Sequence, residues 1–508
     1  MKIQTIKIFF LSIVASMTIA TSMAQNKAPE NPFMDRDYWA TTPSIAEIDA
    51  KIAQGYSITE SNRGGYDPVT FAIFSQNPPA TIAHLLAQGN DVNKRTHDSR
   101  TYLFWAASRG YLDSMELLLD KGARTDLKDS HGYTVAQFAA ATGQDNTSVY
   151  EFLIKNGVDL VGEKDHDGRE VILIAAPRVK NLDLIDYFIS KGMDIHTTDD
   201  NGNGIFSYAA QGGNIDVLNA LIERGVNIKA NHNTKENAML FASRGGRGTS
   251  NSLALFKYLE GLGIDPNVTS VEGVTPIHNL ARSSKDIEIY DYFIAKGVNP
   301  NAVDANGNTA LINAASRNNL EIIKYLAQKT SDIDHLNQEG YSALAIAVQN
   351  NSAEVVSYLL SKGASIDQVD KKGNSLVYHL LDTRGLPKDF DQKVVALKAK
   401  GLDFTKTQEQ DKNLWHLAVQ KNNLALLQTV SKLGADINAK DSQGNTPLHY
   451  AALQTDNVEL LKFLLSKGAD NSLTTGFGET PFELASENEL LVKGGADLNP
   501  PTGSTRRR

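Results

Sequence analysis

The chain lacks cysteine altogether, since none occurs among its 508 residues. Without cysteine the protein can have no disulfide, no thiol nucleophile, no thiolate-bound metal and no lipid attached through a lipobox cysteine. An excess of positive charge is also absent, because the formal net charge is −9. This acidic balance gives no global reason to expect nucleic-acid binding. Apart from the N-terminal segment, no apolar run approaches the roughly 20 residues that span a bilayer.

The sequence motifs of several common active sites are missing as well. There is no His-Glu-x-x-His of a zinc protease, no Gly-x-x-x-x-Gly-Lys-Ser/Thr phosphate loop and no Gly-x-Ser-x-Gly nucleophile elbow. The run Asp165-His166-Asp167-Gly168 superficially resembles a calcium loop, but it lacks the further oxygen ligands and the terminal glutamate. We therefore predict that the protein is not an enzyme and has no catalytic residue, metal site or cofactor.

The first 24 residues have the pattern of a secretory signal peptide. Lys2 and Lys7 form the positive region, residues 8–20 form a short apolar run, and Ser22-Met23-Ala24 supplies small residues for cleavage. An uncleaved membrane anchor is the alternative, although the run is short for a membrane span. We expect an exported protein that begins at Gln25, with the periplasm as the first expected location and the medium as the second.

What the chain does contain is internal repetition. A glycine, or a residue that replaces it, recurs as the marker of a tight turn, and most successive markers lie 33 or 34 residues apart. A fixed period near 33 residues indicates stacked repeats that share one continuous core. A small or apolar residue stands seven positions after every marker, so all of them keep one register. The markers are Gly65, Ser99, Gly132, Gly168, Gly202, Lys235, Gly273, Gly307, Gly340, Gly373, Asp411, Gly444 and Gly478.

Each repeat carries the same local signals for two helices. The marker glycine suits a turn position that needs positive φ. Thr or Ser follows and can cap the first helix, with Pro at the first helical position, as in Thr446-Pro447-Leu448-His449. The second helix has apolar residues at helical spacing and stops at a glycine such as Gly468. Ahead of the first marker, Ser44 and Glu47 form a capping box that predicts a helix of a half-repeat.

With its turn, its Gly-x-Thr-Pro-Leu-His-x-Ala motif, its second helix and its closing Gly-Ala-Asp, the unit resembles the ankyrin repeat over about residues 57–498. The resemblance implies an all-α repeat solenoid of stacked helix-turn-helix units, with β-hairpin fingers on one edge. We expect one solenoid over residues 44–499, with about 13 repeats and an N-terminal capping half-repeat. Residues 25–43 would be a linker and residues 500–508 a flexible tail.

Two sets of residues at equivalent repeat positions invite assignment to a ligand site. His278, His416 and His449 share one position, and the resemblance implies that this imidazole ties adjacent turns together and binds no metal. Aromatic residues six positions after their markers could form a ligand platform. Because Leu and Ile occupy that position in other repeats, we interpret it as buried packing. The aromatic residues are Phe71, Trp105, Phe138, Tyr208 and Phe241.

Three steps between markers are longer than the others. The extra residues fall between the two helices of a unit, near residues 144–147, 247–251 and 384–391. Insertions in repeat proteins map to loops on one face. We favour tolerated variation in loop length, and the alternative is a second contact surface opposite the fingers.

The variable finger tips and helix ends of the first four units collect basic and aromatic residues. The resemblance implies that these positions contact partners, and Arg and Tyr often contribute most of the binding energy of an interface. The alternative is that they are ordinary solvated tips. The residues of this basic strip are Arg63, Tyr66, Phe74, Arg95, His97, Arg100, Arg109, Lys128, His131, Tyr133, Lys164, His166, Arg169 and Arg178.

These features together predict a non-enzymatic scaffold that acts after export and binds another protein through its finger tips and concave helical face. The basic strip favours a partner with an acidic surface. Two alternatives stay open: a secreted effector that binds a host or competitor protein, and a binder of an anionic polymer through the basic strip.

Overall fold

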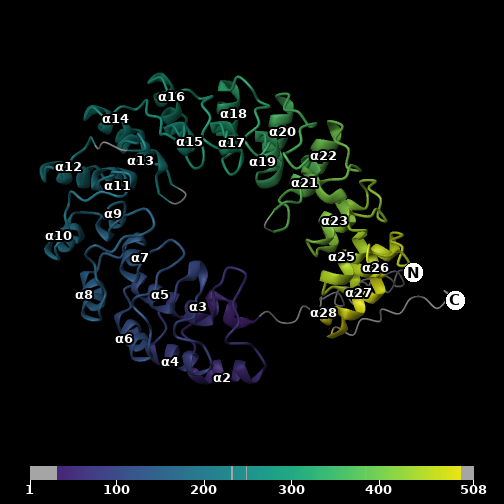
Figure 1. Ribbon diagram of the computed structural model, residues 1–508, viewed down its shortest axis with the longest axis horizontal. Helices are drawn as coiled ribbons and strands as arrows, with labels where there is room; N and C mark the ends of the chain where they lie inside the picture. The colour runs from purple at the N-terminus through teal and green to yellow at the C-terminus, as the bar shows by residue number, and fades with distance from the viewer. Residues whose placement is uncertain (1–30, 230–232, 247–248, 384, 494–508) are drawn as a thin grey trace, which may run out of the picture. The chain divides into compact units, whose positions relative to one another are not determined.

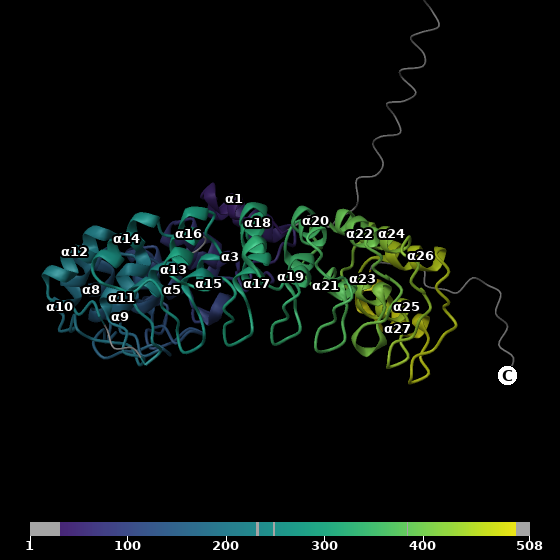
Figure 2. The ribbon, with the colours of Figure 1, turned by 90° about the horizontal axis from the view of Figure 1, so that it is seen from above.

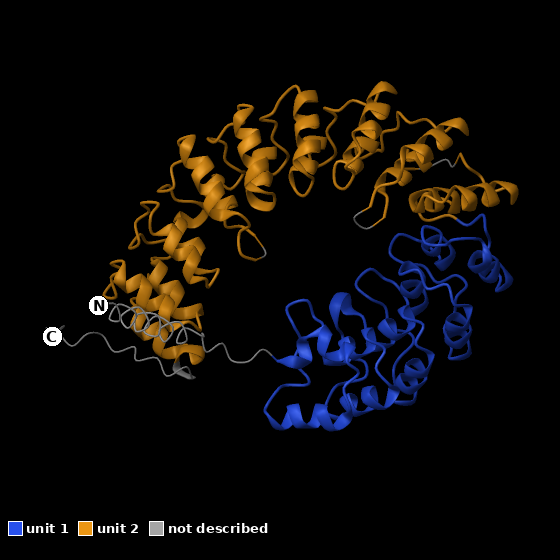
Figure 3. Ribbon diagram, turned by 180° about the vertical axis from the view of Figure 1, so that it is seen from behind, with its two compact units in different colours: residues 1–197 blue, residues 198–508 orange. Residues whose placement is uncertain are grey.

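The computed structural model describes residues 31–229, 233–246, 249–383 and 385–493 (Figure 1). It divides into two compact units, residues 1–197 and residues 198–508 (Figure 3). The described residues form helices and no strand, and two isolated bridges are the only extended pairings among them. This confirms the predicted all-α repeat fold. The expected signal peptide, the whole of the expected tail, the first part of the linker and residues 494–499 of the expected solenoid lie outside the described residues.

Unit 1 pairs a short first helix with a longer second helix in each repeat. The first helices contact one another along one row, and α4 contacts α6 in the second row. The first helices are α3 (Pro68–Phe74), α5 (Tyr102–Ser108), α7 (Val135–Ala141) and α9 (Val171–Ala175). The other elements are η1 (Pro32–Met34), α1 (Arg36–Ala40), α2 (Ile45–Ala53), α4 (Pro79–Ala87), η2 (His97–Ser99), α6 (Leu112–Asp120), α8 (Thr147–Lys155) and α10 (Asp183–Ser190).

Unit 2 repeats the same arrangement. Its first helices are α11 (Ile205–Gly212), α13 (Ala238–Arg244), α15 (Pro276–Leu280), α17 (Ala310–Ala315), α19 (Ala343–Asn350), α21 (Leu376–His379), α23 (Leu414–Val419), α25 (Pro447–Gln454) and α27 (Pro481–Glu487). Its second helices are α12 (Ile215–Glu223), α14 (Leu253–Gly261), α16 (Ile287–Ala295), α18 (Leu320–Lys329), α20 (Ala353–Ser361), α22 (Phe390–Ala399), α24 (Leu424–Val430), α26 (Val458–Ser466) and α28 (Glu489–Lys493), with the 3-10 turn η3 (Glu409–Asp411) before α23.

The turn before each first helix has the predicted left-handed residue at its marker. Every marker has positive φ, including the three that are not glycine: Ser99 at 61°, Lys235 at 58° and Asp411 at 59°. A residue with a Cβ pays steric energy in this region. The backbone of the turn is therefore kept even where the favoured residue is lost, so the register of the repeat depends on more than its glycines.

In the fingers whose turn is fully described, a polar side chain three residues before the marker closes the finger. In the finger of Gly444, one carboxylate oxygen of Asp441 accepts hydrogen bonds from the backbone N–H groups of Gln443 (2.9 Å) and Asn445 (2.8 Å). Successive fingers are also joined through their backbones, as where the N–H of Lys371 donates to the carbonyl of Glu339 at 3.0 Å. In unit 2 the fingers project from one edge of the helices (Figure 2). They are hydrogen-bonded hairpin turns without extended strands.

The core lies between the two rows of helices. The five aromatic residues six positions after their markers are all buried, with exposed fractions between 2% for Phe241 and 7% for Tyr208. The interpretation of that position as packing is therefore confirmed. The predicted capping box is also present, because the Ser44 hydroxyl accepts from the N–H of Glu47 and the Glu47 carboxylate accepts from the N–H of Ser44.

Asparagines between the two helices of several repeats connect each repeat to the one before it. The side-chain amide of Asn351 donates to the carbonyls of Ala315 and Asn318, both at 3.0 Å. In unit 1 the amide of Asn77 does the same to Trp39 (2.9 Å) and Ala72 (3.3 Å). These bonds satisfy carbonyls at helix ends, which have no partner within the helix.

The expected linker over residues 25–43 is in part folded, which corrects that prediction. Within it, η1 and α1 bury Phe33 and Trp39 completely. The Trp39 indole N–H donates to the carbonyl of Phe33 at 2.8 Å, and α1 contacts α3. The segment covers the apolar end of the first full repeat, which would otherwise be exposed to water. No helix among the described residues has the length and apolar character that crossing a membrane requires.

Candidate functional site

The residues of the predicted basic strip do not form one uniform surface in unit 1. They separate into cations paired inside the fold, a cluster of aromatic rings, and exposed side chains without a partner. The separation decides which of them can contact another molecule.

Arg100 and Arg169 are structural cations. The Arg100 side chain is only 9% exposed, and its guanidinium lies 2.9 Å from both Asp98 and Asp129. It also stacks over the ring of Phe138, at 4.1 Å from the ring centre. Arg169 pairs in the same way with Asp165 at 2.6 Å in its own finger. Arg169 holds the carboxylate that closes its own finger, and Arg100 holds Asp129, which closes the next finger. Both arginines are therefore already paired with carboxylates, and their role as contact residues stays a prediction.

Two further cations tie neighbouring fingers together. The Arg95 guanidinium donates to the carbonyls of Ser99 (2.7 Å) and Lys128 (2.6 Å). The Lys128 ammonium group lies 3.3 Å from the Glu163 carboxylate and donates to the carbonyl of Lys164. These side chains are exposed, and a partner could reach them, but part of their hydrogen-bonding capacity is used within the fold.

An aromatic cluster lies at the finger and first-helix ends of the first repeats. Tyr66 and Phe74 are half-buried, and their ring centres are 5.8 Å apart. Phe74 meets the Trp105 ring edge-on at 5.1 Å, and the imidazole of His97 stacks on Tyr66 at 4.7 Å. Arg109 lies over the Phe74 ring at 5.4 Å. The cluster combines exposed ring edges with an accessible guanidinium.

Arg36 also belongs to this cluster, although the sequence analysis does not single it out. Its guanidinium lies 5.1 Å from the centre of the Phe74 ring and 5.6 Å from that of Phe71. It lies on α1, in the segment expected to be a linker, and no repeat period extends that far. The signal in the sequence would have been Trp39, three residues after Arg36. An apolar residue at this helical spacing indicates a short helix that packs against the first repeat.

The remaining residues of the strip are finger-tip and helix-end side chains. Arg63, Lys164 and Arg178 are exposed, and their side chains make no ion pair or hydrogen bond within the described residues. His131 is exposed beside Tyr133, and His166 is exposed at the tip of its own finger. Burial raises the pKa of the Tyr133 hydroxyl, which lies 3.0 Å from Arg169. Arg63, Lys164 and Arg178 are therefore the cations of the strip that are free to bind.

The three equivalent histidines have the structural position that the resemblance implies. The backbone N–H of Thr446 donates to Nδ1 of His449 at 3.0 Å, so Nε2 carries the proton and donates to the carbonyl of Glu479 at 3.2 Å. His278 and His416 make the same pair of bonds. Burial lowers the pKa of all three imidazoles. They connect one repeat to the next as neutral groups.

The candidate site has the chemistry of a binding surface. Among the described residues, no group of three or more His, Asp or Glu side chains could hold a metal ion. The carboxylate of Asp165, in the run that resembles a calcium loop, instead accepts the N–H groups of Asp167 and Arg169. The arrangement offers flat aromatic area and fixed guanidinium groups, which suit recognition of another surface.

Comparison with known proteins supports this architecture. Family models described as ankyrin repeats match residues 69–164, 172–270, 249–335 and 277–370, and a further one matches residues 432–485. Neurogenic locus notch homolog protein 1 of Homo sapiens is 26% identical over 184 residues, which are 34% of this chain and 7% of that protein. Ankyrin repeat domain-containing protein 63 of Homo sapiens is 34% identical over 109 residues, which are 22% of this chain and 26% of that protein.

Among solved structures, the ankyrin repeat domain of human ASB11 is similar to 45% of this chain over the whole of its own length, with 24% identity and a TM-score of 0.39. Of the two relatives compared by sequence, the chain spans only 7% of the Notch homologue and 26% of ankyrin repeat domain-containing protein 63.

Proposed function

The chain belongs to the ankyrin repeat family, and on that premise we propose that it is a non-enzymatic scaffold that acts after export and binds another protein through unit 1. Ankyrin repeats generally serve as protein–protein interaction scaffolds. The observation that carries the proposal is the half-buried aromatic pair Tyr66 and Phe74, which packs on the buried Trp105 and is edged by the guanidinium groups of Arg36 and Arg109. Aromatic and arginine side chains are the residues enriched at the energetic centres of protein interfaces.

The free cations of the strip, on the same unit as this cluster, favour an acidic partner surface. Arg63, Lys164 and Arg178 have no carboxylate partner in the described residues, so an acidic protein can approach them without breaking an internal ion pair. Complementary charge of this kind raises the rate of association at low salt. Arg100 and Arg169 are already neutralised, which lowers the charge density of the strip. That loss favours a protein with its own apolar contacts over an anionic polymer, whose binding would depend on charge alone.

Export is proposed from residues 1–24 alone, whose pattern predicts cleavage before Gln25. N-terminal sequencing of the protein from the periplasm and from the medium tests this. A mature chain that begins at Gln25 supports export, and the fraction that holds it separates a periplasmic scaffold from a secreted effector. A chain that keeps Met1 in the cytoplasm contradicts the proposal.

Site-specific photo-crosslinking in intact cells tests the binding surface. A crosslinking amino acid at Phe74 should capture one partner, whereas the same probe at Lys121, at the exposed end of the second helix α6, should not. Reversal of charge in Arg109→Glu with Arg178→Glu should abolish the product. The matched pair Lys121→Glu with Lys155→Glu, at the ends of second helices, should leave it unchanged. Equal capture at both probe positions, or equal loss in both pairs, contradicts the assignment.

A further inference from the structure

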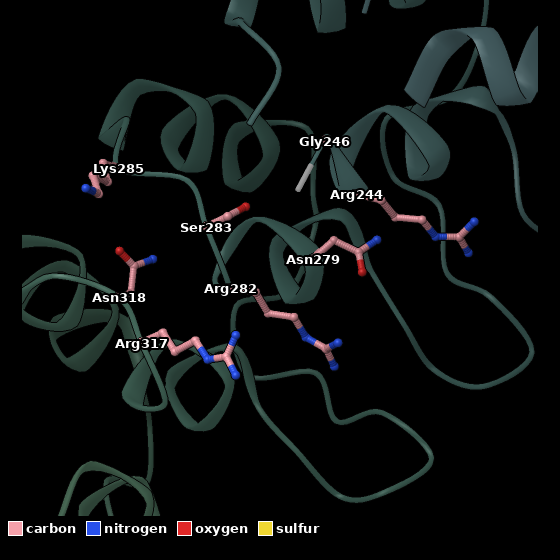
Figure 4. A pocket seen from close by; sticks show the side chains of 8 residues that line it. All are labelled: Arg244, Gly246, Asn279, Arg282, Ser283, Lys285, Arg317 and Asn318. Atoms are coloured by element: carbon pink, nitrogen blue, oxygen red, sulfur yellow. The ribbon is translucent and has the colours of Figure 1, made fainter. Parts of the chain in front are cut away.

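A pocket in unit 2 lies between the C-terminal ends of the first helices α13, α15 and α17 (Figure 4). Its volume is about 460 Å³, and no aromatic or aliphatic side chain lines it. The lining consists of four cationic side chains with small or amide residues between them. These residues are Arg244, Gly246, Asn279, Arg282, Ser283, Lys285, Arg317 and Asn318.

Three of the four cations have no internal counterion. Arg282, Lys285 and Arg317 are exposed, and their side chains make no ion pair or hydrogen bond with the described residues. Arg244 differs, because its guanidinium pairs with Glu236 and lies 4.3 Å from the centre of the Phe241 ring. In Figure 4 the side chains of Arg244, Arg282 and Arg317 point to the same side of the first helices. Like charges brought together in this way raise the local concentration of anions.

The walls of the pocket are fixed by amide hydrogen bonds. The Asn279 amide donates to the Ser243 hydroxyl at 2.9 Å, across the gap between two repeats. The Asn318 amide donates to the carbonyls of Ala281 (2.9 Å) and Ser284 (3.0 Å), on either side of Arg282 and Ser283. The loop that carries Arg282 is therefore held in place before any ligand arrives, which lowers the entropic cost of binding.

The concentration of arginine is particular to this part of unit 2. Arg244 and Arg282 stand nine residues after their markers, and Arg317 stands ten residues after its own. The ninth position of the flanking repeats holds the neutral residues Gln211 and Gln349. The repeat framework needs no cation here, because the neighbouring repeats fold without one. Arg282 and Arg317, which have no internal counterion, are thus in excess of what the fold requires, whereas Arg244 is held by Glu236.

We propose that this pocket binds a small multivalent oxyanion, a molecule with two or more phosphate or carboxylate groups, through Arg282 and Arg317. A planar guanidinium donates two parallel hydrogen bonds to one oxyanion group, so two guanidinium groups can hold two such groups. Lys285 points away from the arginines and adds only to the positive charge around the pocket (Figure 4). The pocket is larger than a single phosphate, and the side chains that line it are cationic, amide or small, which favours an anionic ligand. The site goes beyond the proposed scaffold function, because it is in unit 2 and needs no protein partner.

Isothermal titration calorimetry of the mature chain at low ionic strength tests the proposal, with inorganic tripolyphosphate and citrate as probes. We expect saturable binding of one anion per chain, weaker for inorganic phosphate than for the multivalent probes. The double variant Arg282→Gln with Arg317→Gln should weaken binding at least about tenfold, because it removes charge-assisted hydrogen bonds. The control Lys398→Gln with Lys400→Gln removes the same charge from exposed positions at the C-terminal end of α22 and should change the affinity less than about twofold.

Several results would overturn the site. One is the absence of saturable binding by the wild-type chain, and another is an equal loss of affinity in the arginine and lysine pairs, which indicates diffuse attraction. A third is binding of an aspartate-rich peptide with no binding of either small anion, which assigns the pocket to a protein ligand. Circular dichroism of both double variants shows whether each is folded, and Arg317→Gln alone supplies a milder variant that should weaken binding in the same direction.

Discussion

Replacing Lys393 by methionine should remove a pH-dependent cost to the stability of unit 2. Lys393 lies on α22 and is completely buried. It stands four residues before Leu397, where the equivalent positions of other second helices hold Ile322, Val355 and Leu426, all buried. A lysine thus occupies an apolar position of the repeat. Its ammonium group donates one hydrogen bond, to the carbonyl of Val348 at 2.8 Å.

The magnitude follows from the pKa of this group. Burial lowers the pKa of Lys393 from 10.5 to about 8, and nearby Asp389 offsets only part of the effect. A lowering of this size corresponds to about 3 kcal/mol of free energy. Between the two pKa values the unfolded chain binds a proton that the folded chain does not, so the free energy of unfolding rises with pH. The cost is therefore fully present at pH 7 and is relieved as the pH rises from about 8 to about 10.5.

Methionine keeps an unbranched apolar side chain of similar length and has no charge. The Val348 carbonyl then loses its hydrogen bond, which costs about 1 to 3 kcal/mol at every pH. Lys393→Met should therefore be close to wild type in stability at pH 7. From pH 7 to pH 10 the wild-type chain should gain about 2 to 3 kcal/mol relative to the variant, because only the lysine titrates.

Urea unfolding reports this difference when it is followed by the fluorescence of Trp415, the one tryptophan of unit 2 in the sequence. Trp39 and Trp105 are replaced by phenylalanine in all the chains that are compared. Lys398→Met, which removes an exposed charge from the same helix, should follow the wild-type curve at both pH values. The reasoning is refuted if the wild-type chain gains no stability relative to Lys393→Met between pH 7 and pH 10, so that Lys393→Met is still as stable as the wild type, or more stable, at pH 10.

Three further predictions concern the framework, each measured by urea unfolding. Arg100→Gln should cost about 3 kcal/mol, because it leaves a buried carboxylate without its cation, whereas exposed Arg95→Gln should cost about 1 kcal/mol. Gly340→Ala should cost about 1 to 3 kcal/mol more than Gly363→Ala: both have positive φ, but only at Gly340 would a Cβ lie 2.9 Å from the backbone of the next finger. Burial lowers the pKa of His449 below 6.5, so below pH 6.5 the unfolded chain binds a proton more readily than the folded chain. The free energy of unfolding should therefore keep its full value above pH 6.5 and fall as the pH drops below it. His449→Gln should make that fall smaller.

The framework was predictable from sequence because its signals are local. A turn residue with positive φ, a capping hydroxyl and a terminal glycine each act within one repeat, and repetition confirms each weak signal many times. Even Lys235 and Asp411, which break the glycine pattern, keep the left-handed conformation. Neighbouring fingers hydrogen-bond to both turns, as where the N–H of Val271 donates to the carbonyl of Thr234 and the N–H of Ser442 to that of Gln410, so the period alone was a sufficient guide.

The candidate surface was only partly predictable, because pairing between repeats is not local. Arg100 and Asp129 are 29 residues apart and meet only when two repeats stack, so sequence shows a cation at a finger and not its neutralisation. For Arg36 the sequence erred in the opposite direction, because it did not predict a contact residue there. Arg36 lies outside the repeated segment, and only packing brings it over Phe74. Counting charges along a strip therefore overstated the free positive charge and missed one of its members.

The described structure assigns different tasks to different positions of the repeat. The residue three positions before the marker closes the finger, and the asparagine between the helices binds the preceding repeat, so neither can change without cost to the fold. The ninth and tenth positions after the marker have mixed tasks. Gln211 and Gln349 donate hydrogen bonds to the following repeat, whereas the side chains of Arg178 and Arg317 make no ion pair or hydrogen bond within the described residues. In unit 1 these positions hold Phe74, Arg109 and Arg178, and in unit 2 they hold the arginines of the pocket. The proposed protein surface and the proposed anion site thus use the same two repeat positions, so exchanging Arg178 or Arg317 should change binding while the free energy of unfolding stays within about 0.5 kcal/mol.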